Sequence, residues 1–173
     1  MKPSTYLKAG LVLSISTLIV ACASAPDYSG NTDSRWANFK NWTKITENRT
    51  GTGDPTGFVS GVHKGRDGYR DVYVNDIGKA VILGSAPYNY PAGTVIVKEQ
   101  FDNLAAFKAQ KPTDLTIMVK LQDGATPDAK NWGWVAGYNG KLEETNAFCS
   151  GCHSIATQND FVFTNEDFLR KHY

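Results

Sequence analysis

Apolar and polar residues alternate with a period of two along much of the chain, which is the pattern of half-buried strands. The alternating stretches are rich in valine, isoleucine, threonine and aromatic residues, as strands usually are. Turn residues at 64–68 and at Asp123-Gly124 favour antiparallel pairing. The pattern predicts five strands, over residues 57–63, 70–75, 93–101, 115–122 and 131–138.

Three short stretches are predicted to be helical instead. The first covers residues 34–44, with Ser34 as its expected N-cap. A second helix is expected around residues 149–153, and a third over 165–172 with Thr164 as its cap. Together these elements predict an α+β fold, mainly an antiparallel β-sheet with a few short helices.

The first twenty residues have a different character. Lys2 and Lys8 give a short positive region, and residues 9–20 form an apolar stretch of the length expected for a secretory signal. The following Ile19-Val20-Ala21-Cys22 resembles the lipobox of bacterial lipoproteins, in which the cysteine becomes the lipidated N-terminus. We therefore expect an exported protein of the bacterial cell envelope, anchored in the periplasm by lipid on Cys22.

This interpretation divides the chain into a signal peptide over 1–21, a flexible tether over 22–33 and one domain over 34–173. The alternative is a plain secretory signal cut near Ala23 or Ala25, which would give a soluble secreted protein. In either case the leader is not part of the fold.

The charge balance and the cysteine count of the chain limit the functions that are possible. The 173 residues carry 18 Lys and Arg against 17 Asp and Glu, a formal charge of +1, so there is no basic surface field for nucleic acid. There are three cysteines, an odd number for an exported chain. Lipidation of Cys22 would account for the odd one, leaving Cys149 and Cys152.

Those two cysteines belong to Cys149-Ser150-Gly151-Cys152-His153, the C-x-x-C-H pattern of covalent heme c attachment. Two thiols bind two vinyl groups of one porphyrin, and the adjacent histidine can bind the iron as its proximal ligand. The alternatives are a thioredoxin-like dithiol or half of a zinc site. Both are disfavoured, because the motif lies near the C-terminus and only His63 and His172 remain as further histidines.

Five segments are characteristic in their order and spacing: 70–75 (RDVYVN), 90–99 (YPAGTVIVKE), 130–132 (KNW), 149–153 (CSGCH) and 160–164 (DFVFT). Together they resemble the cytochrome P-460 family, which includes the β-sheet cytochromes c′ (cytochrome c′-beta). The resemblance implies a homodimer and a five-coordinate heme with a free distal side. It also implies an activity on small nitrogen oxides.

Two further site residues follow from the resemblance. Lys98 matches the lysine that is cross-linked to the porphyrin in the P-460 enzymes, although alternation alone would also allow a solvated strand lysine. Arg70 matches a distal arginine that could donate hydrogen bonds to a bound N–O ligand, or it is a surface residue at a strand start. The family's distal carboxylate has no clear counterpart, because its position falls on Thr116 and only a shifted register would offer Asp114.

Several other residues have two interpretations. Aromatic candidates for a distal wall, otherwise core residues, are Phe58, Tyr88 and Tyr90. Trp132 and Trp134 are expected to share a face in the core. Met118 and His63 are the candidates for a sixth iron ligand, but Met118 is expected in the core and His63 at the surface.

Three functions remain open at this stage. The first is an enzyme that oxidises hydroxylamine or nitric oxide at the heme iron and transfers the electrons to an exported acceptor. The second is a non-enzymatic cytochrome c′-beta that binds nitric oxide. The third is a simple electron carrier with Met118 as sixth ligand.

Overall fold

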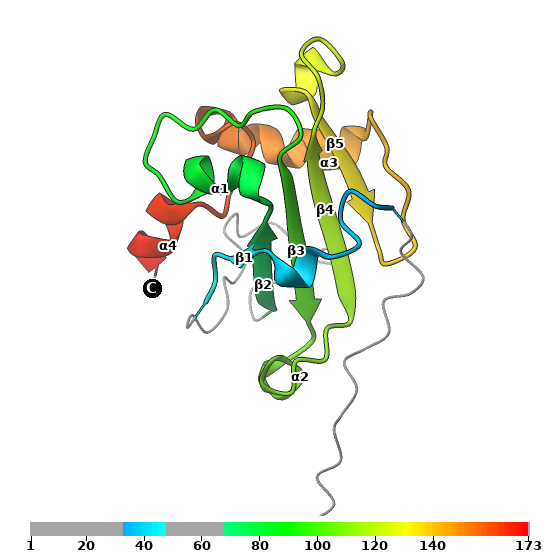
Figure 1. Cartoon of the computed structure of the whole chain (residues 1–173), viewed down its shortest axis with the longest axis vertical. Helices are drawn as coiled ribbons and strands as arrows, with labels where there is room; N and C mark the ends of the chain where they lie inside the picture. Colours follow the sequence, from blue (N-terminus) through cyan, green and yellow to red (C-terminus); the bar gives the residue numbers. More distant parts are fainter. Residues whose placement is uncertain (1–32, 48–67, 173) are drawn as a thin grey trace, which may run out of the picture.

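The computed structural model describes residues 33–47 and 68–172, which form a single antiparallel sheet with short helices around it (Figure 1). The predicted strand 57–63, with Phe58 and His63, and the predicted signal, lipidation site and most of the tether lie outside the described residues. In chain order the elements are η1 (Phe39–Asn41), β1 (Thr43–Lys44), β2 (Tyr69–Val74), α1 (Asp76–Ile82), β3 (Val95–Phe101), α2 (Leu104–Lys108), β4 (Asp114–Lys120), η2 (Pro127–Ala129), β5 (Trp132–Ala136), α3 (Ala147–His153), η3 (Ser154–Asn159) and α4 (Glu166–His172).

The strands lie in the sheet in the same order as in the sequence, β1-β2-β3-β4-β5, and every neighbouring pair is antiparallel. This confirms the predicted fold class and, within a few residues at each end, the four predicted strands that fall on described residues. The register places Val72, Lys98 and Thr116 side by side across β2, β3 and β4. The next row toward one end of the sheet contains Arg70, Gln100 and Asp114.

Each face of the sheet carries its own apolar core. One core packs strand residues such as Val72, Ile96 and Trp134 against Ile82 of α1 and Leu169 of α4, with Cys149 of α3 against it. The other core packs Tyr73, Val97 and Ile117 against Trp36 and Phe39 of the N-terminal segment. In Figure 1 this N-terminal segment, coloured blue to cyan, crosses in front of the strands and α3 passes behind them.

The prediction of a helix over residues 34–44 is wrong. The segment instead forms turns, the short 3-10 helix η1 and the strand β1. Asp33 rather than Ser34 begins it, because the Asp33 carboxylate accepts the Arg35 backbone N–H at 3.0 Å. Pairing of Thr43 with Val74 at the sheet edge draws the end of the segment into extended structure, and this tertiary contact overrides the helical pattern.

The predicted C-terminal helix is confirmed as α4, but its cap is not Thr164. The Asn165 side chain accepts the Phe168 backbone N–H at 3.0 Å instead. Two helices were not predicted, α1 and α2, and each also begins at an asparagine, Asn75 and Asn103. Within the described residues, none of the helices has the length and hydropathy to cross a membrane.

Candidate functional site

Helix α3 carries the two cysteines and the histidine of the C-x-x-C-H motif. The Asn146 side chain caps it by accepting the Cys149 backbone N–H at 2.9 Å, which begins the helix immediately before the motif. Cys149 and Cys152 are both free thiols and partly buried. One helical turn therefore presents two free thiols and the His153 imidazole toward the sheet.

The imidazole of His153 is held on three sides. Its Nδ1 lies 2.7 Å from the carbonyl oxygen of Phe161. Its ring lies between the rings of Trp134 and Phe163, with centroid distances of 4.7 and 5.1 Å. Burial lowers the pKa of His153 to about 4, although the bond to Phe161 opposes this shift and the charge of Lys98 adds to it. A neutral ring whose Nδ1–H donates to Phe161 keeps the lone pair on Nε2, as a metal ligand requires.

Lys98 lies on the same face of the sheet as the motif helix, at the middle strand β3. The side chain is partly buried, and its ammonium group is within electrostatic reach of Cys149, Cys152 and His153. Burial lowers the pKa of Lys98 to about 7, and the charge of Arg70 lowers it further while Asp114 opposes the shift. A substantial fraction of Lys98 is therefore the neutral, nucleophilic amine near pH 7.

Arg70 is buried, with 2% of its surface exposed, so the interpretation as a surface residue is wrong. It lies in β2 one row beyond Lys98, and its Nη1 donates to the Gly68 carbonyl at 3.3 Å. The charge of Arg70 lowers the pKa of Lys98, so the two basic groups lie within electrostatic reach of each other.

The register decides between the two candidates for a distal carboxylate. Thr116 lies directly opposite Lys98, so this place in the row contains a hydroxyl group. Asp114 lies one row further along the same face, opposite Gln100, and its charge acts on Lys98. Of these two candidates, only Asp114 carries a carboxylate; it is partly buried, and its Oδ1 accepts the Leu115 backbone N–H at 2.8 Å.

Gln100 is a residue of this face to which the sequence assigned no role. Its side chain is fully buried, and neither its amide nitrogen nor its amide oxygen has a hydrogen-bond partner among the described residues. Burying an amide without partners is costly, so the position is not explained by packing alone. One feature of the sequence could have identified Gln100: it is a polar residue in an apolar strand, two residues after Lys98. Strand alternation places both side chains on the same face.

The remaining candidates belong to the core. Five of them are buried in the apolar core on the site face, which is the face of the sheet that packs against α3: Tyr88, Tyr90, Met118, Trp132 and Trp134. The expectation that the two tryptophans share a face is confirmed. The ring of Trp134 also contacts His153, a role beyond packing that the sequence did not indicate.

The donor set fits a covalently bound heme c. Two thiols three residues apart that form no disulfide, and a neutral imidazole whose Nδ1 is hydrogen-bonded to a carbonyl, are the groups that such a heme requires. A zinc site fits less well, because no group of three His, Cys, Asp or Glu side chains gathers in the part of the chain that the structure describes. A thioredoxin-like dithiol also fits poorly, because the motif follows an antiparallel sheet and not a βαβ unit.

Comparison with known proteins agrees with this assignment. A protein-family model described as Cytochrome P460 matches residues 36–164, which include every described site residue named above. No curated protein matches the sequence.

Proposed function

The chain belongs to the cytochrome P460 family, which implies a heme protein of nitrogen-oxide metabolism with covalently bound heme c, and we propose that it oxidises hydroxylamine or nitric oxide. The electrons would pass to an exported acceptor. The observation that supports this activity is the meeting of Lys98 and Arg70 with the motif helix on one face of the sheet.

Each residue of the site has a separate task in this proposal. Cys149 and Cys152 would hold the porphyrin by thioether bonds, and His153 would bind the iron. When bound, the heme supplies an iron that accepts a small N–O ligand and its electrons. Arg70 would donate hydrogen bonds to a small N–O ligand, and Lys98, whose lowered pKa favours the neutral amine, is the residue that matches the cross-linked lysine of the family.

Oxidation of hydroxylamine releases protons as well as electrons, so a nearby base is needed. Asp114 is the carboxylate of the site face whose charge reaches Lys98, and we assign the proton-accepting role to it. The fully buried amide of Gln100 lies between Arg70 and Asp114 in the register and can hydrogen-bond a ligand or a water molecule between them.

One observation favours the second function, a non-enzymatic cytochrome c′-beta that binds nitric oxide. The residue opposite Lys98 is Thr116, which cannot act as a carboxylate base. The third function, an electron carrier with Met118 as sixth ligand, has less support because Met118 packs in the apolar cluster.

We further propose that the protein is exported and anchored to the periplasmic face of a membrane by lipid on Cys22, and that it forms a homodimer. Lipid anchoring strengthens with each acyl chain. The native protein should therefore fractionate with membranes, whereas Cys22→Ser should be soluble. Equal solubility of the two would indicate a plain secretory signal.

Mass spectrometry and optical spectra of the matured protein test the enzymatic proposal. The wild type should contain one covalent heme, a peptide that joins heme to residue 98 and a red-shifted Soret band. Lys98→Ala should shift the band back and abolish hydroxylamine oxidation while nitric oxide still binds. Lys108→Ala, which removes an exposed lysine from α2, is the matched control and should change neither property.

The same measurements identify the alternatives. Covalent heme without the residue-98 cross-link and without hydroxylamine turnover would support the nitric oxide carrier and reject the enzyme. Sharp low-spin bands would indicate the electron carrier. An unmodified chain mass, under conditions that mature a control c-type cytochrome, would reject the heme assignment altogether.

A further inference from the structure

Two consecutive residues of the turn beside the motif helix adopt left-handed backbone conformations. Asp160 has a φ of 52° and Phe161 a φ of 66°. Aspartate tolerates this region, but for a bulky residue such as phenylalanine it is an uncommon and strained conformation. Strained conformations persist only where the surroundings hold them in place, so the contacts of this turn are informative.

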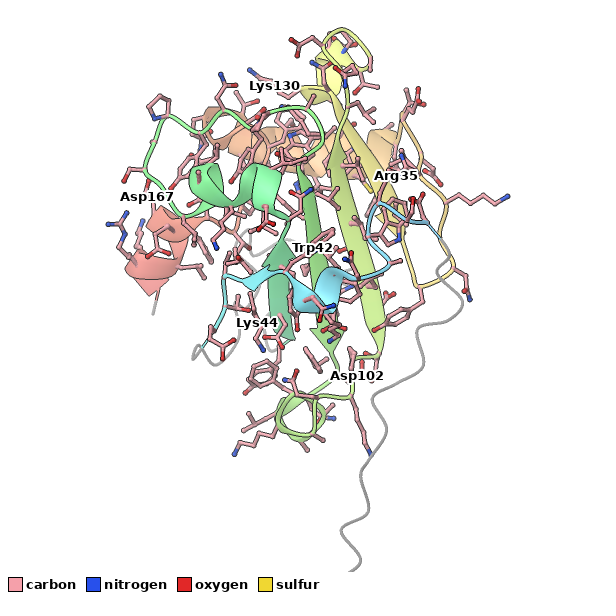
Figure 2. The ribbon with its side chains drawn as sticks, viewed as in Figure 1. Arg35, Trp42, Lys44, Asp102, Lys130 and Asp167 are labelled. Atoms are coloured by element: carbon pink, nitrogen blue, oxygen red, sulfur yellow. The ribbon has the colours of Figure 1, made fainter. Side chains whose placement is uncertain are left out.

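Three different groups hold Asp160 in place. Its carboxylate oxygens lie 2.8 and 2.7 Å from the Lys120 ammonium group, and Oδ2 accepts the Tyr90 backbone N–H at 2.9 Å. Its backbone carbonyl accepts the Trp132 indole N–H at 2.8 Å. Lys120 is fixed in turn by donating to the carbonyl of Lys130, a residue labelled at the upper end of the sheet in Figure 2, at 2.7 Å.

The backbone of Phe161, the next residue in the turn, contacts His153. The Phe161 carbonyl accepts the His153 Nδ1–H, and the Phe161 backbone N–H donates to the Ala156 carbonyl at 2.9 Å. Asp160 thus connects the ends of β4 and β5 to the next residue, whose carbonyl contacts the imidazole. A change in the backbone conformation of Phe161 would move its carbonyl away from Nδ1.

Both members of the Lys120–Asp160 pair are buried, with 8% and 6% of their side chains exposed. Buried ion pairs are often no more stable than apolar side chains of the same volume, so stability alone does not explain them. We propose that this ion pair is a positioning device for His153, which fixes the Phe161 carbonyl and so sets the electron donation of the imidazole to the heme iron. The inference rests on the proposed function, in which His153 is the iron ligand.

The physical consequence concerns the reduction potential. A hydrogen bond from Nδ1–H to a carbonyl raises the basicity of the ligating histidine. A more basic imidazole stabilises ferric iron, so the intact Lys120–Asp160 pair should lower the reduction potential of the heme. Loss of the pair should raise this potential and lower the iron–histidine stretching frequency of the ferrous protein.

The experiment uses the full, heme-loaded protein with the double variant Lys120→Met/Asp160→Asn. Asparagine adopts the left-handed conformation as readily as aspartate, and the net charge does not change, so mainly the positioning is lost. We expect a lower iron–histidine frequency by resonance Raman and a higher midpoint potential. Lys120→Arg, which keeps the pair, should stay close to the wild type in both.

The matched control is Lys44→Met/Asp71→Asn, which removes a second ion pair with a buried carboxylate from the opposite face of the sheet, also without a change in net charge. It should move neither readout. The single variants Lys120→Met and Asp160→Asn provide a second test. A purely Coulombic effect would shift their potentials in opposite directions, whereas a positioning role predicts a rise in both.

The outcomes separate this inference from the proposed function. A heme-loaded double variant with the frequency and potential of the wild type would overturn the positioning role and leave the function intact. Opposite shifts in the single variants with an unchanged Raman frequency would also overturn it. Absence of an iron–histidine band from the ferrous wild type itself would overturn the proposed five-coordinate heme with His153 as its ligand, and the inference with it.

Discussion

On β2 and β3, the two faces of the sheet carry charged side chains of opposite sign. Along β2 the consecutive residues Arg70 and Asp71 point to different faces, and along β3 so do Lys98 and Glu99. The basic member of each pair lies on the face of the motif helix. The acidic member lies on the face covered by the N-terminal segment, where Lys44 is labelled in Figure 2.

On the covered face the charges are neutralised. Asp71 and Glu99 are directly opposite each other and fully buried, an arrangement that would repel strongly without counter-charges. Lys40 forms an ion pair with Glu99, and Lys44 lies 3.1 Å from the Asp71 carboxylate. The two carboxylates also raise the pKa of nearby Tyr73, after burial as the main cause, so its hydroxyl stays protonated.

On the site face the polar groups are arranged differently. Two basic side chains, Lys98 and Arg70, lie close enough for one to lower the pKa of the other, and the buried amide of Gln100 forms no hydrogen bond with the part of the chain that the structure describes. The covered face thus pairs its buried carboxylates with lysines, whereas the site face contains a lysine whose pKa is strongly lowered. A perturbed pKa of this kind is typical of a binding or catalytic site.

The largest predicted effect is on the covered face. Lys40→Met should lower the free energy of unfolding by about 3 kcal/mol, because it leaves the fully buried Glu99 carboxylate without its counter-charge. Urea denaturation of the variant and the wild type measures this loss. The double variant Lys40→Met/Glu99→Gln should recover most of it, and failure to recover would show that Lys40 acts through packing.

The corresponding change on the site face should have the opposite sign. The pKa of Lys98 falls from 10.5 to about 7 on folding, so the unfolded chain binds more protons between these values. The penalty is fully present below pH 7, decreases as the pH rises and is absent above about pH 10.5. In the heme-free protein, Lys98→Met should therefore raise the free energy of unfolding by about 2 kcal/mol at pH 6 after allowance for partial exposure.

Denaturation at pH 6 and pH 9 checks both the sign and the pH dependence. The gain from Lys98→Met should shrink at pH 9, where part of the penalty is already relieved in the wild type. A loss of stability at both pH values would show that Lys98 is paired strongly enough to be a structural residue.

A smaller effect is expected from the hydroxyl of Thr46 on the covered face. It donates to the Asp71 carboxylate at 3.2 Å and accepts the Val72 backbone N–H at 3.1 Å. Thr46→Val keeps the shape but removes both bonds, so unfolding should become easier by about 1–2 kcal/mol. Thr43→Val, on the neighbouring partly exposed β1, is the control and should change stability much less.

The smallest predicted effects are shifts in the titration of Lys98 itself. Arg70→Gln should raise the pKa of Lys98, and Asp114→Asn should lower it, each by less than about one pH unit. NMR of isotopically methylated lysine in the heme-free protein measures both. Shifts in the same direction would contradict the assigned charges around the amine.

The sheet and the motif were predictable because each has a local signal. Alternation identified β3 and β4, and the fixed spacing of Cys149, Cys152 and His153 identified the motif without any tertiary information. The helix predicted at 34–44 failed for the converse reason, since Thr43 pairs with Val74, a partner some thirty residues away in the sequence.

The contacts of the site residues were harder to predict from the sequence. The partner of His153 is a backbone carbonyl, and any residue type carries one, so no side-chain pattern could indicate Phe161. The choice between Thr116 and Asp114 depended on the strand register. Alternation predicts the face of the sheet on which a residue lies, but not which residues lie opposite it on the neighbouring strands. Burial of Arg70 likewise depended on neighbours distant in the sequence.

The order of the strands in the sheet has a consequence for how the molecule folds. Because each strand pairs with the one next to it in the chain, most of its contacts close short loops and need little chain entropy. The helix with the thiols and the turn that orients the histidine come after the last strand. A chain that emerges N-terminus first can therefore complete its sheet while Cys149 and Cys152 are still accessible, and the docking of α3 then becomes the final event. Pulsed hydrogen exchange during refolding would show this as protection of β3 and β4 before α3.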